Sequence, residues 1–243
     1  RNVDLGGIEQ VDGSSFRWRG RYRHDLNSAE TLETHLGVFS HFDPKIPARF
    51  AKPDFLFLAN IDPRLQLAVL KQVERPRLVA SDTMNFWIES RRPELIELLA
   101  HVDLLTLNDA EARQLTEQSN LVQAARWIMA HGPKHVIIKK GEHGAFLFRE
   151  NNIFFAPAYP LESVFDPTGA GDSFAGGFIG YLARTGDLSD ANMRRAVIYG
   201  SAMGSFAVEK FSIERLMTVT RPELDARLHA FKQLVAFDED VSA

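Results

Sequence analysis

Residues 166–178 read Asp166-Pro167-Thr168-Gly169-Ala170-Gly171-Asp172-Ser173-Phe174-Ala175-Gly176-Gly177-Phe178. Two glycines separated by a single alanine precede a segment whose large apolar residues recur at helical spacing, namely Phe174, Phe178, Tyr181 and Leu182. Glycine-rich backbone at a helix N-terminus leaves N–H groups unpaired, and the helix macrodipole adds positive potential there. The stretch therefore predicts a turn that leads into a helix, with an anion-binding backbone at their junction.

Asp172 falls in the first turn of this expected helix. A carboxylate at that place can take a proton from an alcohol, while neighbouring amides stabilise negative charge on a transferred phosphoryl group. The alternative is that Asp172 only caps the helix. Capping explains the aspartate but not the glycines, Thr168 and Asp166 at these spacings, so we favour the functional interpretation.

Upstream of this stretch, apolar runs of strand length alternate with helix-period segments from about residue 53 onward. We expect strands at 55–59, 77–81, 104–107 and 136–139, and antiparallel additions at 145–148 and 153–155. We expect helices at 65–73, from near Pro93, after a cap at Asp109, and at 121–130, 170–184, 191–208 and 222–235. This order predicts an α/β fold in which helices cover both faces of a mainly parallel sheet.

The first fifty residues break this alternation. The segment Phe16-Arg17-Trp18-Arg19-Gly20-Arg21-Tyr22-Arg23 places arginine at every second position, which predicts a strand with one apolar and one basic face. It is either an edge strand with solvated arginines or a flap that closes over an anionic or aromatic substrate. The absence of an internal repeat or a flexible linker leads us to expect one domain over 1–243.

The overall composition excludes several classes of function. The chain carries 28 Lys+Arg and 32 Asp+Glu, a net charge of −4, which gives no basic footprint for nucleic acid or an anionic membrane. The absence of cysteine excludes disulfides and thiolate metal sites. No apolar run has the roughly 20 residues of a membrane span, and residues 1–7 lack the apolar core of a signal peptide. We expect a cytoplasmic protein.

Three rival motifs fit poorly. The segment 171–175 is near to the G-x-S-x-G nucleophile elbow of hydrolases, with Ser173 as nucleophile, but no good strand precedes it. A dinucleotide fingerprint needs a third glycine where Phe174 stands. His131 and His135 are four residues apart, but Gly132-Pro133 breaks any helix between them, so they lack metal-ligand spacing.

The 166–178 stretch resembles the C-terminal signature of the ribokinase-like (PfkB) carbohydrate kinase family, which contains sugar kinases and adenosine-type nucleoside kinases. Two other segments resemble family elements in the expected order. Asn108-Asp109-Ala110-Glu111 is similar to the N-x-x-E element, and Lys140-Gly141-Glu142-His143-Gly144 is similar to the K-x-G-x-x-G nucleotide turn. Weaker similarities lie at 82–85 and 205–210, and the resemblance covers roughly residues 53 to 236.

The resemblance implies a ribokinase-like three-layer sandwich with a small β lid, in which 1–50 form the lid and 51–243 form the nucleotide-binding and catalytic core. It also implies ATP-dependent phosphotransfer to an alcohol group of a sugar or nucleoside. By position, Asp172 corresponds to the general base, and Gly169, Ala170 and Gly171 to the amides of the anion hole. Thr168 corresponds to a residue near the γ-phosphate, and Asp166 to a position that holds a monovalent cation such as K⁺ in some members.

Asn108 and Glu111 correspond to residues that act on the Mg²⁺–phosphate assembly, Glu111 through water. Lys140, Gly141 and Gly144 correspond to residues that approach the nucleotide. From the residues alone, Asn108 and Glu111 are equally a helix-capping pair, and 140–144 is equally a plain hairpin turn. We expect Asn108, Lys140 and Gly169 to meet at one edge of the sheet, because sites in such sheets lie at the carboxyl ends of strands.

The start of the chain departs from the family pattern. Gly6-Gly7 lacks a preceding strand, so we find no counterpart of the family's Gly-Gly segment, and we expect several dozen N-terminal residues of the acceptor pocket to be missing. The resemblance implies a small-molecule acceptor and, in some members, a homodimer through the lid. The alternative function is a non-catalytic nucleotide- or sugar-binding module of the same fold, and the intact Asp172 favours the enzyme.

Overall fold

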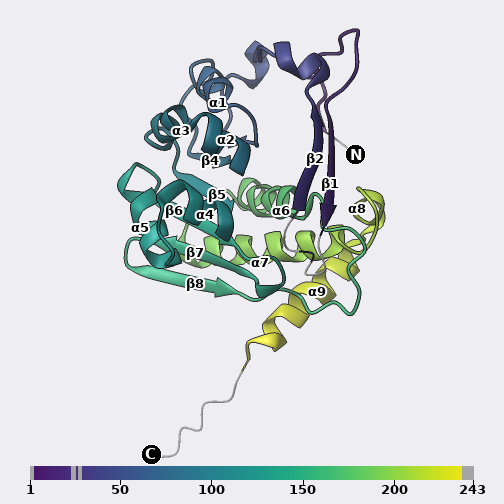
Figure 1. The fold of residues 1–243 in the computed structure, drawn as a ribbon. Coiled ribbons are helices and arrows are strands. Elements are labelled where there is room, and N and C mark those ends of the chain that lie inside the picture. Colours follow the sequence, from purple (N-terminus) through teal and green to yellow (C-terminus); the bar gives the residue numbers. More distant parts are fainter. Residues whose placement is uncertain (1–2, 23–25, 27–28, 237–243) are drawn as a thin grey trace, which may run out of the picture.

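The computed structural model describes residues 3–22, 26 and 29–236, and Arg23 of the expected flap strand lies outside them. Figure 1 shows a small two-stranded sheet beside a larger, helix-covered one. The larger sheet contains β3 (Phe55–Leu58), β4 (Leu78–Asp82), β5 (Leu104–Asn108), β6 (His135–Lys139), β7 (Ala145–Arg149) and β8 (Asn152–Ala156), in that spatial order. Strands β3 to β6 are parallel, whereas β7 and β8 are antiparallel additions. The predicted mainly parallel sheet is confirmed.

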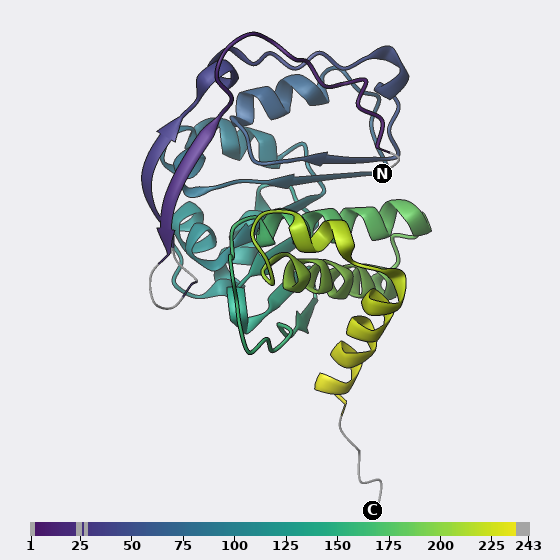
Figure 2. The same ribbon diagram turned by 90° about the vertical axis from the view of Figure 1, so that its right-hand side faces the viewer.

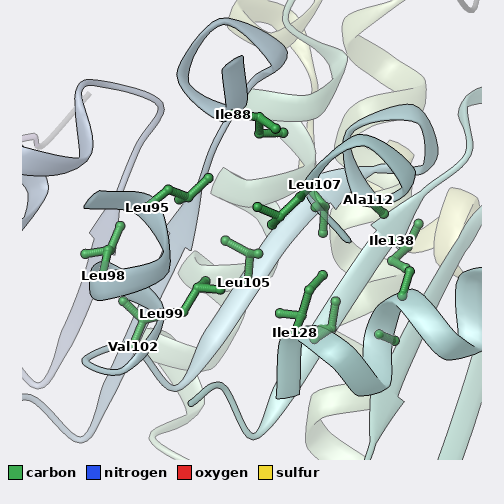
Figure 3. Close-up of a cluster of buried hydrophobic side chains, with 14 of the residues drawn as sticks. Ile88, Leu95, Leu98, Leu99, Val102, Leu105, Leu107, Ala112, Ile128 and Ile138 are labelled. Atoms are coloured by element: carbon green, nitrogen blue, oxygen red, sulfur yellow. The ribbon is translucent and has the colours of Figure 1, made fainter. Parts of the chain in front are cut away.

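Each strand sends alternate residues to opposite faces of this sheet. On one face, Val79, Leu105 and Ile138 pack with α1 (Pro63–Leu70), α2 (Asn85–Ser90), α3 (Arg92–Leu99), α4 (Asp109–Thr116) and α5 (Leu121–Ala130), and Figure 3 shows the centre of this cluster. On the other face, Leu104 and Ile137 pack with α6 (Ala170–Thr185) and α7 (Asp190–Ala207). Burial of these alternating faces produces the predicted three layers.

Helices α6 and α7 pack closely because two glycines allow their backbones to approach. A Cβ on Gly177 would lie 2.9 Å from the Tyr199 carbonyl oxygen, and one on Gly200 would lie 2.8 Å from that of Phe174. The chain then ends in α8 (Glu214–Thr218) and α9 (Arg221–Leu234). None of the helices in the described ranges is long and apolar enough to cross a membrane.

The structure corrects several sequence-based boundaries. Asn108, not Asp109, caps α4, because its extended backbone ends β5 and its Oδ1 accepts a hydrogen bond from the Glu111 amide. Helix α1 begins at Pro63 after an Asp62 cap. The short helices α2 and α8 were not predicted, since one or two turns leave too little apolar periodicity to detect.

The N-terminal strand is one half of a lid. Strands β1 (Arg17–Tyr22) and β2 (Ala29–His35) form an antiparallel pair with a bulge between Arg19 and Gly20. Along β1, exposed arginines alternate with half-buried Trp18, Gly20 and Tyr22, as the period-two pattern predicts. A Cβ on Gly20 would lie 2.1 Å from Trp18 Cη2, so this glycine makes room for the indole. Figures 1 and 2 show the lid strands side by side, standing apart from the larger sheet.

Candidate active site

The carboxyl ends of the parallel strands bring distant polar residues together. Asn108 at the end of β5 pairs in register with Lys139 at the end of β6. The Lys139 ammonium reaches past β5 and lies 3.4 Å from Oδ2 of Asp82, at the end of β4. A Cβ on Gly171 would lie 3.1 Å from the same Nζ. The start of α6 therefore lies at the sheet edge that also carries Asp82, Asn108 and Lys139.

The start of α6 is built by a left-handed glycine. Gly169 is the N-cap with φ +79°, and its carbonyl accepts the Ser173 amide at 2.9 Å and the Ser173 hydroxyl at 2.8 Å. The Ala170 amide donates to the Pro167 carbonyl at 3.2 Å. The amides of Gly169, Gly171 and Asp172 donate to no residue within the described ranges. Unpaired amides at the positive end of a helix of 16 residues are suited to bind an anion.

Asp172 lies in the first turn of α6 and is exposed. Among the residues that the structure describes, none donates a hydrogen bond to its carboxylate. Its charge acts on the buried Asp82 and contributes to raising the pKa of that carboxyl. An ionised carboxylate is an acceptor only, so Asp172 has the chemistry and the access that a proton acceptor needs.

The turn before α6 involves both Asp166 and Thr168. The Thr168 amide donates to Asp166 Oδ1 at 2.9 Å, and the Thr168 hydroxyl donates to the Tyr22 phenol oxygen at 3.1 Å. The lid therefore touches the segment that was predicted to lie near the γ-phosphate. Asp166, predicted to hold a monovalent cation, uses one carboxylate oxygen within this turn.

Asn108 and Glu111 form a reciprocal capping box. Asn108 Oδ1 accepts the Glu111 amide at 2.8 Å, and Glu111 Oε2 accepts the Asn108 amide at 2.7 Å. Burial raises the pKa of the Glu111 carboxyl to about 7, and the charges of Asp82 and Asp109 add to the rise, whereas the Asn108 amide and Lys139 oppose it. The capping interpretation is correct for the local structure.

Asn108 and Glu111 suit a Mg²⁺ ion that is also bound by phosphates better than a Mg²⁺ ion bound by protein side chains alone. The described part of the chain has no group of three or more His, Asp or Glu side chains that could hold a metal alone. Mg²⁺ keeps several waters and takes only one or two carboxylates besides substrate phosphates. A half-buried Glu111 with a raised pKa is a carboxylate whose ionised form a nearby cation would stabilise.

Lys139 and Asp82 were not predicted as site residues, although the weak similarity at 82–85 includes Asp82. Asp82 is only 6% exposed, and its Oδ1 accepts the Thr83 amide at 2.9 Å. Burial raises the pKa of the Asp82 carboxyl, and the charge of Lys139 opposes this rise. The signal for Lys139 was available, because a K-x-G-x-x-G pattern aligned on Gly141 and Gly144 has its lysine at 139 rather than 140.

The segment 140–144 forms the tight connection between β6 and β7. The Lys140 amide donates to the Gly144 carbonyl at 2.8 Å, and Gly144 has φ +88°. A Cβ on Gly144 would lie 2.1 Å from the Ala156 carbonyl oxygen, so only glycine fits. The Lys140 ammonium lies 5.9 Å from the centroid of the Phe146 ring. The hairpin interpretation is correct for the local structure here too.

Comparison with known proteins identifies the family. The sequence profile described as pfkB family carbohydrate kinase matches residues 29–218. The chain belongs to this family. It is 28% identical over 187 residues to a cytidine kinase from Thermococcus kodakarensis, which covers 75% of this chain and 66% of that protein. It is 26% identical over 173 residues to a nucleoside kinase from Methanocaldococcus jannaschii, which covers 71% of this chain and 54% of that protein.

Solved structures of pfkB-type kinases share the fold. A nucleoside kinase from Burkholderia thailandensis, solved with inosine, superimposes with a TM-score of 0.69 at 22% identity, covering 90% of this chain and 70% of that one. The predicted ribokinase-like sandwich is thereby confirmed. The chain spans only 66% of the length of the cytidine kinase and 54% of the length of the M. jannaschii nucleoside kinase.

Proposed function

We propose that this pfkB family protein is an ATP-dependent kinase that phosphorylates a hydroxyl group of a sugar or nucleoside. The observation that carries the proposal is the exposed Asp172 carboxylate beside the unpaired amides of Gly171 and Asp172. Relatives named cytidine kinase, nucleoside kinase and ribokinase support phosphotransfer to this class of acceptor.

The transfer needs a base and a place for negative charge. Asp172 accepts the proton of the acceptor hydroxyl, and the oxygen of that hydroxyl forms a bond to the γ-phosphorus. The bond from that phosphorus to the β–γ bridging oxygen breaks, and its electron pair leaves with ADP. The unpaired amides at the start of α6 donate to the phosphoryl oxygens as charge develops there. The proton then passes from Asp172 to solvent.

The remaining predicted residues hold the phosphates and the cation. Asn108 and Glu111 would hold Mg²⁺ through water, and the ion would supply positive charge that offsets the charge of the phosphates. In this proposal Thr168 would contact the γ-phosphate and Asp166 would hold K⁺. Lys140, Gly141 and Gly144 would border the nucleotide. We further propose one domain over 1–243, a small-molecule acceptor and a dimer through the lid. A cytoplasmic location stays a prediction.

A non-catalytic nucleotide- or sugar-binding module is the alternative. ADP release with a panel of ribose, fructose, cytidine, inosine and other nucleosides, measured with and without Mg²⁺, separates the two. An enzyme releases ADP at a rate that depends on one acceptor and on Mg²⁺. Calorimetric binding of ATP or an acceptor without acceptor-dependent ADP release would favour the module and contradict the proposal.

A further inference from the structure

The end of α7 supports the turn that precedes α6. The Val208 carbonyl accepts hydrogen bonds from the amides of Phe165, at 2.8 Å, and of Asp166, at 3.3 Å. One turn earlier, α7 packs so closely on the start of α6 that a Cβ on Gly204 would lie 3.3 Å from the Ala170 carbonyl oxygen. The last turn of α7 therefore fixes the position of the backbone that leads into α6.

A carboxylate held by two arginines lies next to Val208. Glu209 Oε2 accepts a hydrogen bond from Arg215 Nε at 2.8 Å, and Glu209 Oε1 accepts one from Arg227 Nη2 at 2.6 Å. The three side chains are 22%, 16% and 12% exposed, in that order of residue number. Burial raises the pKa of Glu209, but the hydrogen bonds from Arg227 and Arg215 outweigh burial and hold that pKa below its usual value. Glu209 is therefore an ionised carboxylate whose two oxygens are both fixed.

The two arginines connect the end of α7 to the neighbouring segments. Arg215 comes from α8 and also donates to Glu223 Oε1 on α9, at 2.7 Å. Arg227 comes from α9, donates to Ser205 Oγ at 2.7 Å, and lies 4.0 Å from the centroid of the Tyr159 ring. Tyr159 belongs to the connection between β8 and α6. Arg227 therefore contacts both the end of α7 and the segment that leads into the turn before α6.

Stability alone is a poor explanation of this ionic network. Replacing a buried ion pair by apolar side chains is often neutral or stabilising, so such a pair is better explained by the one arrangement that it selects. The arrangement here includes Ser212, which lies in the short connection from α7 to α8 and has φ +55°. A left-handed residue other than glycine costs energy and persists where its surroundings enforce it. Arg215 spans this connection back to Glu209 and supplies such a constraint.

We infer that Glu209 is a positioning residue for the turn before α6, and that it acts through the Val208 carbonyl and the Asp166 amide. The contacts continue from Asp166 Oδ1 to the Thr168 amide, at 2.9 Å, and so reach the unpaired amides that begin at Gly169. The inference rests on the proposed kinase function and adds a residue that contacts neither the phosphates nor the acceptor in this arrangement.

The test compares the turnover and the melting temperature of Glu209→Gln with those of Asp190→Asn. Asp190 is the matched control because it also accepts hydrogen bonds from two arginines, Arg149 and Arg194, at the opposite end of α7. A misplacement of about 1 Å can cost roughly 100-fold in rate, so Glu209→Gln should lower kcat by about 10- to 100-fold. The KM for ATP should change little, since the predicted nucleotide border at 140–144 is not part of the network. Asp190→Asn should lower the melting temperature and leave kcat unchanged.

Glu209→Gln leaves two largely buried arginines without their shared carboxylate, so this variant could unfold. The double variant Glu209→Gln/Arg227→Met removes a positive charge together with the negative one and keeps the measurement usable. The same fall in kcat is expected for the double variant, because the Val208 carbonyl again loses the group that holds its neighbour.

The route through Asp166 is tested in the Asp166→Ala background, in which the hydrogen bond to the Thr168 amide is absent. Glu209→Gln should lower kcat by a clearly smaller factor in this background than in the unchanged protein, because the contact that carries the effect onward is already broken. A merely structural role of Glu209 would give equal factors in both backgrounds, and that result would contradict the inference.

Three results have distinct meanings. A fall in kcat for folded Glu209→Gln that exceeds the change for Asp190→Asn supports the inference. An active unchanged protein whose folded Glu209→Gln or double variant has the same kcat overturns the inference and leaves the kinase function standing. Absence of acceptor-dependent ADP release from the unchanged protein overturns both.

Discussion

The Tyr22 phenol oxygen of the lid accepts a hydrogen bond from the Thr168 hydroxyl, at 3.1 Å, and so connects β1 to the turn that precedes α6. The two residues are 146 positions apart in the chain. This contact places the lid directly beside the proposed phosphate site. A lid that touches the site on closing excludes water and helps to position the acceptor.

Tyr22→Phe should therefore weaken acceptor use more than it weakens folding. Loss of one hydrogen bond, worth about 0.5–1.5 kcal/mol, predicts a rise of about 2- to 10-fold in the KM for the acceptor with a nearly unchanged melting temperature. Tyr181→Phe, on α6 and stacked on Tyr199, is the control. Equal acceptor KM values for Tyr22→Phe and the unchanged protein would show that the contact has no role in acceptor binding.

Glu111→Gln should change how stability depends on pH. Burial raises the folded-state pKa of Glu111 from 4.5 to about 7. Because the folded state holds this proton more tightly, the contribution to stability is fully present below pH 4.5, the unfolded-state pKa. It is lost as the pH rises from 4.5 to about 7. Glutamine does not ionise, so the variant lacks this loss. The melting temperature of the variant minus that of the unchanged protein should therefore increase between pH 5 and 8. Parallel curves for the variant and the unchanged protein would contradict the raised pKa of Glu111.

Gly171→Ala should separate stability from nucleotide binding. Gly171 is helical, and alanine is favoured there by up to about 1 kcal/mol, so folding should not suffer. Its new Cβ would come 3.1 Å from the Lys139 ammonium, which would have to shift by a few tenths of an ångström. ADP affinity should fall several-fold, while Gly180→Ala, whose Cβ meets nothing within 4 Å, should leave affinity unchanged. Unchanged ADP affinity in Gly171→Ala would mean that the position of the Lys139 ammonium does not affect ADP binding.

Arg227→Met should weaken the packing of α9 against the rest of the protein. The guanidinium lies 4.0 Å from the ring centroids of both Tyr159 and Phe206, and it donates to Glu209 Oε1 at 2.6 Å. Its side chain is 12% exposed, so solvent screens this pair little. We expect a loss of about 1–3 kcal/mol in urea unfolding. The exposed Arg221–Asp225 pair provides the contrast, since Arg221→Met should cost less than about 1 kcal/mol.

The layers of the fold could be predicted from the sequence, because a strand or helix that is buried on one or two faces carries apolar residues at regular spacing. Strands β3 to β6 are short apolar runs, and their alternate residues fill two separate cores. Strand β2 was not predicted, because its sequence Ala-Glu-Thr-Leu-Glu-Thr-His is mostly polar and shows no apolar alternation. It forms a strand by pairing with β1.

The candidate site was predictable where chemistry is local in the chain. Gly169, Asp172 and the Asn108–Glu111 pair could be selected because their partners lie within a few residues. The Asp82–Lys139 pair joins residues 57 positions apart across β5, and only the sheet order brings them together. The predicted lysine, Lys140, lies by the ring of Phe146, whereas its neighbour Lys139 lies beside the Asp82 carboxylate.

The central claim is that Asp172 is the base, and turnover of Asp172→Asn with the best acceptor tests it most directly. General-base assistance contributes roughly 10²- to 10⁴-fold, so kcat should fall by about that factor. ADP affinity should change little, because the amides at the start of α6 are backbone groups that survive the substitution. A folded Asp172→Asn protein with near-normal turnover would contradict the assignment.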